Sequence, residues 1–276
     1  MFHNLKLWCK SRMSDITRHM LGPHVKALLV QSESHLFLVD PEDYGVGRQL
    51  RLKGMYGEDE LARLLPTITP ESNVLVVGTH VGTLAIPLAG HCRAVSAIEA
   101  NPVTFELLQA NIAINRVSNL TAYNIAASDR QQELKFLVNR SNSGGSKIVP
   151  QKKEYQYYSD KPDEITVPGF PLDDKFPDQA FDLIVMDIEG SEYFALRGME
   201  NILNQAKTLV VEFVPHHLRN VSNVSIEQFL EPLAMFDSLT VPSLNKTVGK
   251  DQFHNCLRQL YDSDQSDDGL LFQRTG

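Results

Sequence analysis

The segment of residues 73–99, NVLVVGTHVGTLAIPLAGHCRAVSAIE, constrains the fold more than any other part of the chain. Apolar residues 74–77 predict a buried strand, and Gly78 and Gly82 predict a tight turn after it. A helix should follow, and a second apolar strand ends at Glu99. This order predicts a parallel α/β sheet, with the turn and the acid at its carboxyl-terminal edge.

The acid at the end of the second strand indicates a nucleoside site. Glu99 follows Gly82 by 17 residues, close to the roughly 20 expected between a glycine turn and a ribose-binding acid. His80 stands where G-x-G-x-x-G has the middle glycine that admits a pyrophosphate. We therefore expect S-adenosylmethionine, which has a ribose and no phosphate, in preference to NAD or FAD. A tight turn without a ligand is the alternative.

The next blocks add strands to the same edge. Asn101 and Pro102 predict a helix start, because asparagine is a good N-cap and proline is tolerated at the first helical position. A short strand is expected near residues 121–125, and another over 183–186 ends at Asp187. Ligands of open α/β sheets bind beyond the carboxyl ends of the strands, so we expect these turns to face one site.

Carboxylates and histidines follow the strands predicted at 183–186 and 208–213. They are Asp187, Glu189, Glu192, Glu212, His216 and His217. Neighbouring strands would bring these side chains together, and crowded carboxylates raise one another's pKa, as suits a base working near neutrality. The same oxygens could hold Mg²⁺, with Asp187 and Glu212 as candidate ligands. The structural alternatives are helix capping by Glu189 and Glu192 and a solvated loop position for His216 or His217.

Three motifs resemble the FkbM-type class I S-adenosylmethionine-dependent methyltransferases. Residues 74–82 are similar to the motif V-L-D-V-G-A-N-x-G, and residues 99–115 to E-P-N-P-x-x-x-x-x-L-x-x-N-x-x-x-N. Residues 187–199 resemble D-V-E-G-x-E-x-x-x-L-x-G-M, the most distinctive of the three. The resemblance extends over roughly residues 50–215. It implies a Rossmann-like, mostly parallel twisted sheet with helices on both faces and an antiparallel edge strand, for which residues 268–272 are the candidate.

The chain departs from the family pattern at three positions. Val76 stands in place of an aspartate near the methionine end of the cofactor, and His80 in place of an asparagine. Val185 replaces a lysine that commonly precedes the D-V-E-G run, so the resemblance predicts that an electrostatic partner of the acids is missing. The substitutions at Val76 and Val185 keep a cofactor-binding protein without transfer activity as one alternative. An NAD(P)-dependent oxidoreductase on the same sheet is another.

The favoured hypothesis is an O-methyltransferase that acts on a hydroxyl of a small molecule, either a sugar or a secondary metabolite. Glu99 would bind the ribose and Asp129 the adenine amino group. Tyr56 and Glu58 belong to a segment that similar enzymes place over the cofactor. The expected cofactor-binding residues are Gly78, His80, Gly82, Glu99, Asn101, Asp129, Tyr56 and Glu58. The expected catalytic residues are Asp187, Glu189 and, as an alternative base, His216.

Two segments surround this core in the predicted domain organisation. Residues 1–57 should form a helix and a β-hairpin, with strands over 25–30 and 35–39, and residues 58–276 the cofactor-binding domain. The N-terminal helix either packs on its own domain or contacts a membrane or partner. Residues 139–168 are polar and rich in glycine and serine, which predicts an irregular excursion between two strands. Its tyrosines, Tyr155, Tyr157 and Tyr158, are candidates for stacking on an acceptor.

Composition excludes some classes of partner. The formal charge of −8 argues against general nucleic-acid binding, which needs basic surface. No apolar run reaches the roughly 18 residues of a membrane span. Three widely spaced cysteines predict reduced thiols and a cytoplasmic protein. The sequence leaves a homo-oligomer open.

Overall fold

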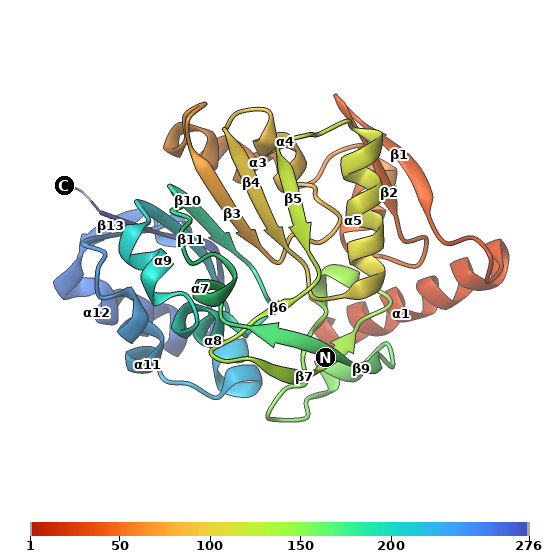
Figure 1. Cartoon of the computed structure of the whole chain (residues 1–276). Helices are drawn as coiled ribbons and strands as arrows, with labels where there is room; N and C mark the ends of the chain where they lie inside the picture. Colours follow the sequence, from red (N-terminus) through yellow and green to blue (C-terminus); the bar gives the residue numbers. More distant parts are fainter. Residues whose placement is uncertain (1, 275–276) are drawn as a thin grey trace.

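A central sheet of eight strands forms the body of the computed structural model, which describes residues 2–274 (Figure 1). Its strand order is β13-β12-β14-β11-β10-β3-β4-β5. The five strands from β11 to β5 are parallel. The bounds are β3 Asn73–Val77, β4 Ala94–Ile98, β5 Leu120–Tyr123, β10 Leu183–Met186, β11 Thr208–Phe213, β12 Ser238–Val241, β13 Lys246–Gly249 and β14 Asp267–Gln273. The parallel sheet predicted from the sequence is therefore present.

The strand order reverses between β3 and β10, which lie side by side although 105 residues lie between them in the sequence.

 Residues 78–182 make up this separation, and they contain β4, β5 and a second, smaller sheet. Such a reversal is the point at which open α/β sheets bind ligands, beyond the carboxyl ends of their strands. The turns after β3, β4 and β10 all lie at this place, and so do Glu99 and Asp187, the acids that follow β4 and β10.

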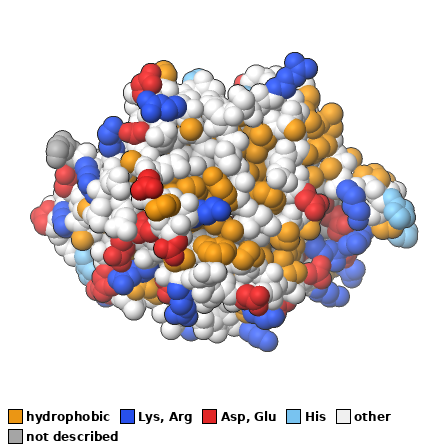
Figure 2. Space-filling model, in the orientation of Figure 1, with side chains coloured by type: hydrophobic (Ala, Val, Ile, Leu, Met, Phe, Trp, Pro, Cys, Tyr) orange, Lys and Arg blue, Asp and Glu red, His pale blue; other side chains and the backbone are white. Residues whose placement is uncertain are grey.

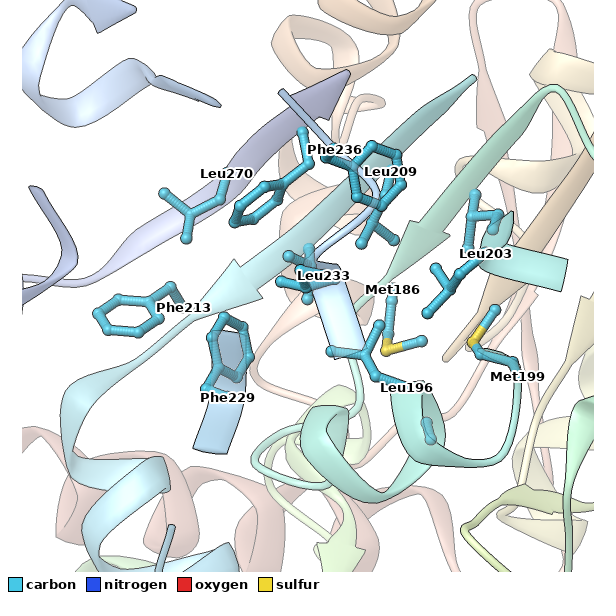
Figure 3. Packing of buried hydrophobic residues seen from close by; sticks show 14 of the residues in the cluster. Met186, Leu196, Met199, Leu203, Leu209, Phe213, Phe229, Leu233, Phe236 and Leu270 are labelled. Atoms are coloured by element: carbon cyan, nitrogen blue, oxygen red, sulfur yellow. The ribbon is translucent and has the colours of Figure 1, made fainter. Parts of the chain in front are cut away.

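Both faces of the sheet are buried, as the continuous apolar strands predict. On β3, Leu75 and Val77 point into one core while Val74 and Val76 point into the other. Figure 3 shows the first core, where Phe213 and Phe229 pack edge to face. The helices that cover this face are α7 Leu172–Lys175, α8 Glu192–Arg197, α9 Glu200–Gln205, α11 Ile226–Leu230 and α12 Phe253–Asp262. The opposite core takes side chains from α2 Val46–Lys53, α3 Glu58–Leu64 and α4 Ala85–Ala89.

The N-terminal hairpin is hydrogen-bonded to helix α5, which spans Pro102–Ile114. Its strands are β1 Leu28–Ser32 and β2 His35–Val39, so the first strand begins three residues later than predicted. Asn111 accepts a hydrogen bond from the Leu38 N–H at 2.6 Å and donates one to the Leu38 carbonyl at 3.1 Å. Asn115 binds the N–H and carbonyl of Leu36 in the same way. The two asparagines of the motif at 99–115 therefore hold the hairpin.

Helix α1 spans Phe2–Leu21 and runs along the outside of the molecule (Figure 1). This agrees with the predicted N-terminal helix; Met1 lies outside the described residues, as do residues 275 and 276 at the end of the predicted second domain. No helix within residues 2–274 combines the length and the apolar character needed to cross a membrane. The division at residue 57 stays a prediction, because the hairpin shares a core with α4 and the central sheet.

The predicted excursion at residues 139–168 is wrong in one respect, because it forms regular structure. A second sheet has the strand order β6-β9-β7-β8, with bounds β6 Ala126–Ala127, β7 Gln132–Val138, β8 Lys147–Ile148 and β9 Asp163–Phe170. Helix α6 spans Tyr155–Tyr158 between its strands. The apolar side chains of Leu134, Phe136 and Val138 alternate along β7 and pack together with those of β9. This alternation is a strand signal that lies just before residue 139, outside the polar segment.

The C-terminal segment completes one face and one edge of the central sheet. Helix α11 is followed by a short 3-10 turn, because Pro232 has no N–H to continue the helix. Ser225 does cap it, in a capping box with Gln228. Strand β14 is antiparallel to β11, as expected, but β12 and β13 lie beyond it, so the edge strand of the sheet is β13.

Candidate active site

The glycine turn after β3 lies against the end of β10. Gly78 has φ of +88°, and a Cβ there would lie 1.7 Å from the Asp187 carbonyl oxygen. A side chain is therefore excluded both by the backbone conformation and by the close contact. Gly82 has φ of +93° and packs against Ile86 and Leu108. The two glycines thus bring the turn next to the acid-bearing turn after β10.

Glu99 lies at the centre of this turn region. Its Oε2 accepts a hydrogen bond from the His80 N–H, and its Oε1 accepts one from the Asn101 N–H, both at 2.8 Å. Burial raises the pKa of Glu99 to about 7, although these backbone N–H groups oppose the change. Each carboxylate oxygen keeps a second lone pair for a ligand. Asn101 caps α5 through its side chain, so it orients Glu99 and does not face a cavity.

A cavity, which we call the glycine-turn cavity, opens beside Glu99. Its wall is mostly apolar and comes from β3, β4 and the second sheet. The residues that line it are Val77, Gly78, His80, Ile98, Glu99, Ala100, Ile125, Ala126, Ala127, Phe136, Gly144, Ser146, Ile148, Asp187, Ile188 and Ser191. A narrow apolar slot with one buried carboxylate suits a flat base attached to a ribose.

The second sheet supplies part of this wall that sequence reasoning missed. Phe136 of β7 and Ile148 of β8 line the cavity. The turn before β8 also closes over the glycine turn, because His80 Nε2 lies 2.7 Å from the Ser143 hydroxyl. The His80 Nδ1 atom is buried and has no hydrogen-bond partner among the described residues. His80 therefore lines the cavity with a ring that Ser143 holds in place, while its Nδ1 atom is enclosed by protein.

Next to the glycine-turn cavity is a second one, the charged cavity. It contains Glu189, Glu212, His216, His217 and Lys147. The Lys147 ammonium is 2.7 Å from Glu189 Oε2, and Lys147 is only 6% exposed. His217 Nε2 lies 3.4 Å from Glu189 Oε2, and His217 Nδ1 lies 3.7 Å from Glu212 Oε2. The predicted convergence of the two acid-bearing strands is present in the structure.

Asp187 connects the two cavities. It lines the glycine-turn cavity, and together with Glu189 it lines a bridging cavity that leads to the charged cavity. Asp187 is an exposed residue, so its carboxyl group is accessible to a ligand, although the surrounding protein partly desolvates it. Burial, followed by the charges of Glu189 and Glu192, raises the pKa of Asp187 well above its ordinary value. Burial and Asp187 do the same to the pKa of Glu212.

Lys147 supplies the positive charge that seemed to be missing at Val185. Val185 is a buried strand residue of β10 that also lines the bridging cavity. Lys147 comes from β8 instead, in the segment predicted to be irregular, and reaches the same group of acids. No spacing rule connects residue 147 with residue 189, so the sequence did not reveal the pair. The electrostatic partner is present, but it comes from a different strand.

Glu192 has a structural position in the turn after β10. Its Oε1 accepts hydrogen bonds from the N–H groups of Ile188 and Gly190, each at 3.1 Å. Glu189 itself has φ of +57° and Gly190 has φ of +108°. A Cβ on Gly190 would approach the Val221 side chain to 2.6 Å. Glu192 therefore stabilises the turn through these backbone hydrogen bonds. The Glu189 side chain lines the bridging cavity and the charged cavity.

Asp129 and Glu58 lie away from the glycine turn, whereas Tyr56 lies beside it. Asp129 lies outside both cavities and accepts hydrogen bonds from Ser128 and Gln132. Glu58 lines a separate surface cavity beside the hairpin, whereas Glu60 faces the bridging cavity. Tyr56 lines both of these, and burial together with Asp187 raises its pKa to about 12.

The two histidines of the charged cavity have different partners. The ring of His216 stacks on Tyr157 with 6.2 Å between centroids, while His217 is the histidine that reaches Glu189 and Glu212. Burial, followed by the Lys147 charge, lowers the pKa of His217. Tyr157 is buried and lines the cavity, whereas Tyr155 is exposed. The sequence selected His216, but the geometry favours its neighbour.

The expected Mg²⁺ site does not fit these side chains. Two groups have ligand atoms within 4.8 Å of one another: Asp187, Glu192 and Glu212, and Glu189, Glu212 and His217. Glu192 already binds two backbone N–H groups, and the Lys147 ammonium already neutralises Glu189. One ligand of each group is therefore already engaged within the protein, and a metal would have to displace its partner.

The strand order, the reversal beside the glycine turn and the acid after β4 define a Rossmann-like class I methyltransferase fold. Residues 77–237 match the family model of the methyltransferase FkbM domain. This match covers more than half of the chain, which therefore belongs to the FkbM methyltransferase family, within the S-adenosylmethionine-dependent methyltransferases. No curated protein sequence matches the chain.

Solved structures share the arrangement at low sequence identity. A methyltransferase FkbM from Methylobacillus flagellatus KT is 17% identical with a TM-score of 0.41, and the match covers 75% of this chain and 44% of that one. An rRNA methylase from Streptococcus thermophilus is 12% identical with a TM-score of 0.44, covering 79% and 95%. TYW2 of M. jannaschii in complex with AdoMet is 15% identical with a TM-score of 0.44, covering 90% and 87%. Similarities this distant carry no information about substrate.

Proposed function

We propose that this chain is an S-adenosylmethionine-dependent O-methyltransferase that acts on a hydroxyl of a small molecule, such as a sugar or secondary metabolite. The observation that carries the proposal is the position of Asp187. It lines the glycine-turn cavity, and the turn that follows it carries Glu189 into the charged cavity. A cofactor in the first cavity and an acceptor in the second would therefore meet at one carboxylate.

The glycine-turn cavity fits the cofactor. Glu99 would accept hydrogen bonds from the ribose hydroxyls, and the apolar wall that includes Phe136 would hold the adenine. Gly78 would give the methionine portion access, and His80 would lie beside it. When bound, the cofactor supplies an electrophilic methyl group on its sulfonium. Because Asp129 lies outside the cavity, we do not propose it for the adenine amino group.

Asp187 is the proposed base. A hydroxyl is a weak nucleophile until its proton is removed. The raised pKa of Asp187 makes its ionised carboxylate a stronger base than an ordinary one. Glu189, held by Lys147 at 2.7 Å, would orient the acceptor in the charged cavity. Asp187 would take the proton of the acceptor hydroxyl as the acceptor oxygen takes the methyl group that the cofactor would supply.

The charge of the second cavity supports a small acceptor. Glu189, Glu212, Asp160 and Asp268 line it, and these carboxylates would repel a phosphate backbone. The overall charge of −8 acts in the same direction. Hydroxyl groups, by contrast, can donate hydrogen bonds to carboxylates. We propose a cytoplasmic protein on the basis of its free cysteines, Cys9, Cys92 and Cys256.

The alternatives gain no support from the site. For an NAD(P)-dependent oxidoreductase, His80 stands where a pyrophosphate would pass, and its ring is tied to Ser143. An inactive cofactor-binding protein was suggested by the valine at position 185, but Lys147 supplies a cation to the acids. Calorimetric titration with S-adenosylmethionine, NAD and NADP separates these functions. Binding of NAD in preference to S-adenosylmethionine would overturn the proposal.

The role of Asp187 can be tested by methyl transfer. Release of S-adenosylhomocysteine should be measured across a panel of hydroxyl acceptors, and then with Asp187→Asn. We expect kcat to fall by about 10²–10⁴, with binding of the cofactor retained. Asp129→Asn, which lies outside both cavities, is the matched control and should keep full activity. An unchanged kcat in Asp187→Asn would exclude Asp187 as the base.

A further inference from the structure

Helix α1 has its apolar side chains on the side that faces solvent. Leu5, Met13, Ile16 and Met20 recur at spacings of eight, three and four residues, which places them along one side of a helix. Trp8 lies beside this stripe. Trp8 and Ile16 are each 50% exposed, and Met20 is 79% exposed. Ordinary surface helices turn this kind of face towards the core.

The opposite side of α1 is polar and is fixed to the body of the protein. The Thr17 hydroxyl lies 2.7 Å from the Tyr44 hydroxyl. Arg140 donates a hydrogen bond to Asp15 at 3.0 Å and also pairs with Glu42. These contacts set the rotation of the helix about its axis. The outward direction of the apolar stripe is therefore built into the fold.

Basic side chains border the stripe. Lys6 lies on one flank and Arg12 on the other, where the Arg12 guanidinium is 5.6 Å from the centroid of the Trp8 ring. The helix carries four Lys or Arg residues and one acid, although the whole chain has a formal charge of −8. Figure 2 shows Lys and Arg side chains gathered over this part of the molecule. The positive charge is thus concentrated around the exposed apolar face.

We propose that α1 is an interfacial helix that binds the surface of an anionic lipid membrane through Leu5, Trp8, Ile16 and Met20. An apolar stripe with tryptophan and with Lys or Arg at its borders is the pattern of helices that lie in the plane of a membrane interface. The basic flanks match anionic headgroups. A second copy of the chain fits less well, because both flanks are basic and any pairing of two stripes would oppose like charges.

The chain carries its own probe for this contact, because Trp8 is its only tryptophan. Fluorescence of the full chain should be measured with vesicles of phosphatidylcholine alone and of phosphatidylcholine with phosphatidylglycerol. We expect a blue shift of Trp8 emission and co-sedimentation with the anionic vesicles, both weakened by salt. Neither effect, or binding to both vesicles alike at any salt concentration, would overturn the proposal.

Two sets of variants separate the apolar and the charged contributions. Ile16→Ser with Met20→Ser should weaken vesicle binding by about tenfold or more. Lys6→Glu with Arg12→Glu should weaken binding to anionic vesicles by about thirtyfold or more. Leu52→Ser is the control, since Leu52 is 67% exposed on α2 and belongs to another surface. A Leu52→Ser effect as large as the α1 effects would contradict the assignment.

The remaining outcome is self-association. Light scattering after size exclusion should give a monomer without lipid, and the Trp8 emission should not depend on protein concentration. A dimer that shifts the Trp8 emission in the absence of lipid would show that a second copy covers the stripe, and would overturn the proposal. Calorimetric titration with S-adenosylmethionine confirms that each variant is folded, since the α1 residues above lie outside the glycine-turn cavity.

Discussion

The two cavities at the carboxyl edge of the sheet are built in different ways. The glycine-turn cavity takes Gly78, His80 and Glu99 from one short segment, in which strand, turn and acid follow each other directly. The charged cavity takes Lys147 from β8 and Glu189 and His217 from the turns after β10 and β11. Local backbone geometry thus places the polar groups of the first cavity, whereas those of the second depend on long-range packing. We expect substitutions to affect them differently.

The largest effect should come from Gly78→Ala. The new methyl group would lie 1.7 Å from the Asp187 carbonyl oxygen, and alanine is strained at φ of +88°. We expect a loss of unfolding free energy of at least about 3 kcal/mol and no measurable cofactor binding. Gly22→Ala is the matched control, because Gly22 also has positive φ but has nothing within 4 Å of a Cβ. Denaturant unfolding and calorimetry measure both. Equal effects of the two variants would mean that conformation, and not contact, makes Gly78 necessary.

A smaller effect is expected in the charged cavity from Lys147→Met. This variant leaves Asp187, Glu189 and Glu212 without the ammonium, so the repulsion between the carboxylates increases. We expect a loss of about 2 kcal/mol of stability, with weaker acceptor binding and little change in cofactor affinity. Adding Val185→Lys should restore part of both losses, because it returns a cation to the other side of the acids. Failure of this second substitution to rescue would show that the position of Lys147, beyond its charge, matters.

The smallest effect concerns pH. The pKa of Glu99 is raised to about 7, and ribose hydroxyls donate to its ionised form. Cofactor affinity should therefore be highest above about pH 7 and fall as the carboxylate is protonated, by about tenfold from pH 8 to about pH 6. Glu99→Gln should bind more weakly and lose this dependence, whereas Asp129→Asn should keep it. Calorimetry over this range checks the prediction, and a flat profile for the unmodified protein would contradict it.

Sequence reasoning succeeded where neighbouring residues form one structural unit. The turn at Gly78, the acid Glu99 and the cap at Asn101 could be placed because each strand ends within a few residues of them. The convergence of Asp187 with Glu212 followed from the rule that strands of a parallel sheet end at one edge. The same local reasoning identified the helix and hairpin at the N-terminus, to within three residues.

The missed features depend on contacts between distant segments. Phe136 and Ile148 line the glycine-turn cavity because the second sheet folds over it, and the alternation along β7 indicates a strand without saying what it covers. Lys147 pairs with Glu189 across 42 residues. The choice between His216 and His217 depends on the short helix that follows β11, which turns adjacent side chains in different directions.

The amide side chains on α5 have a consequence for how this protein behaves at high concentration. One edge of β2 pairs with β1, and Asn111 and Asn115 satisfy the N–H and carbonyl groups of Leu36 and Leu38 on its other edge. An open edge of this kind is where a strand from another molecule can add and start aggregation. The asparagines occupy the hydrogen-bonding groups of that edge. A variant that lacks them should therefore aggregate faster, even if its active site is intact.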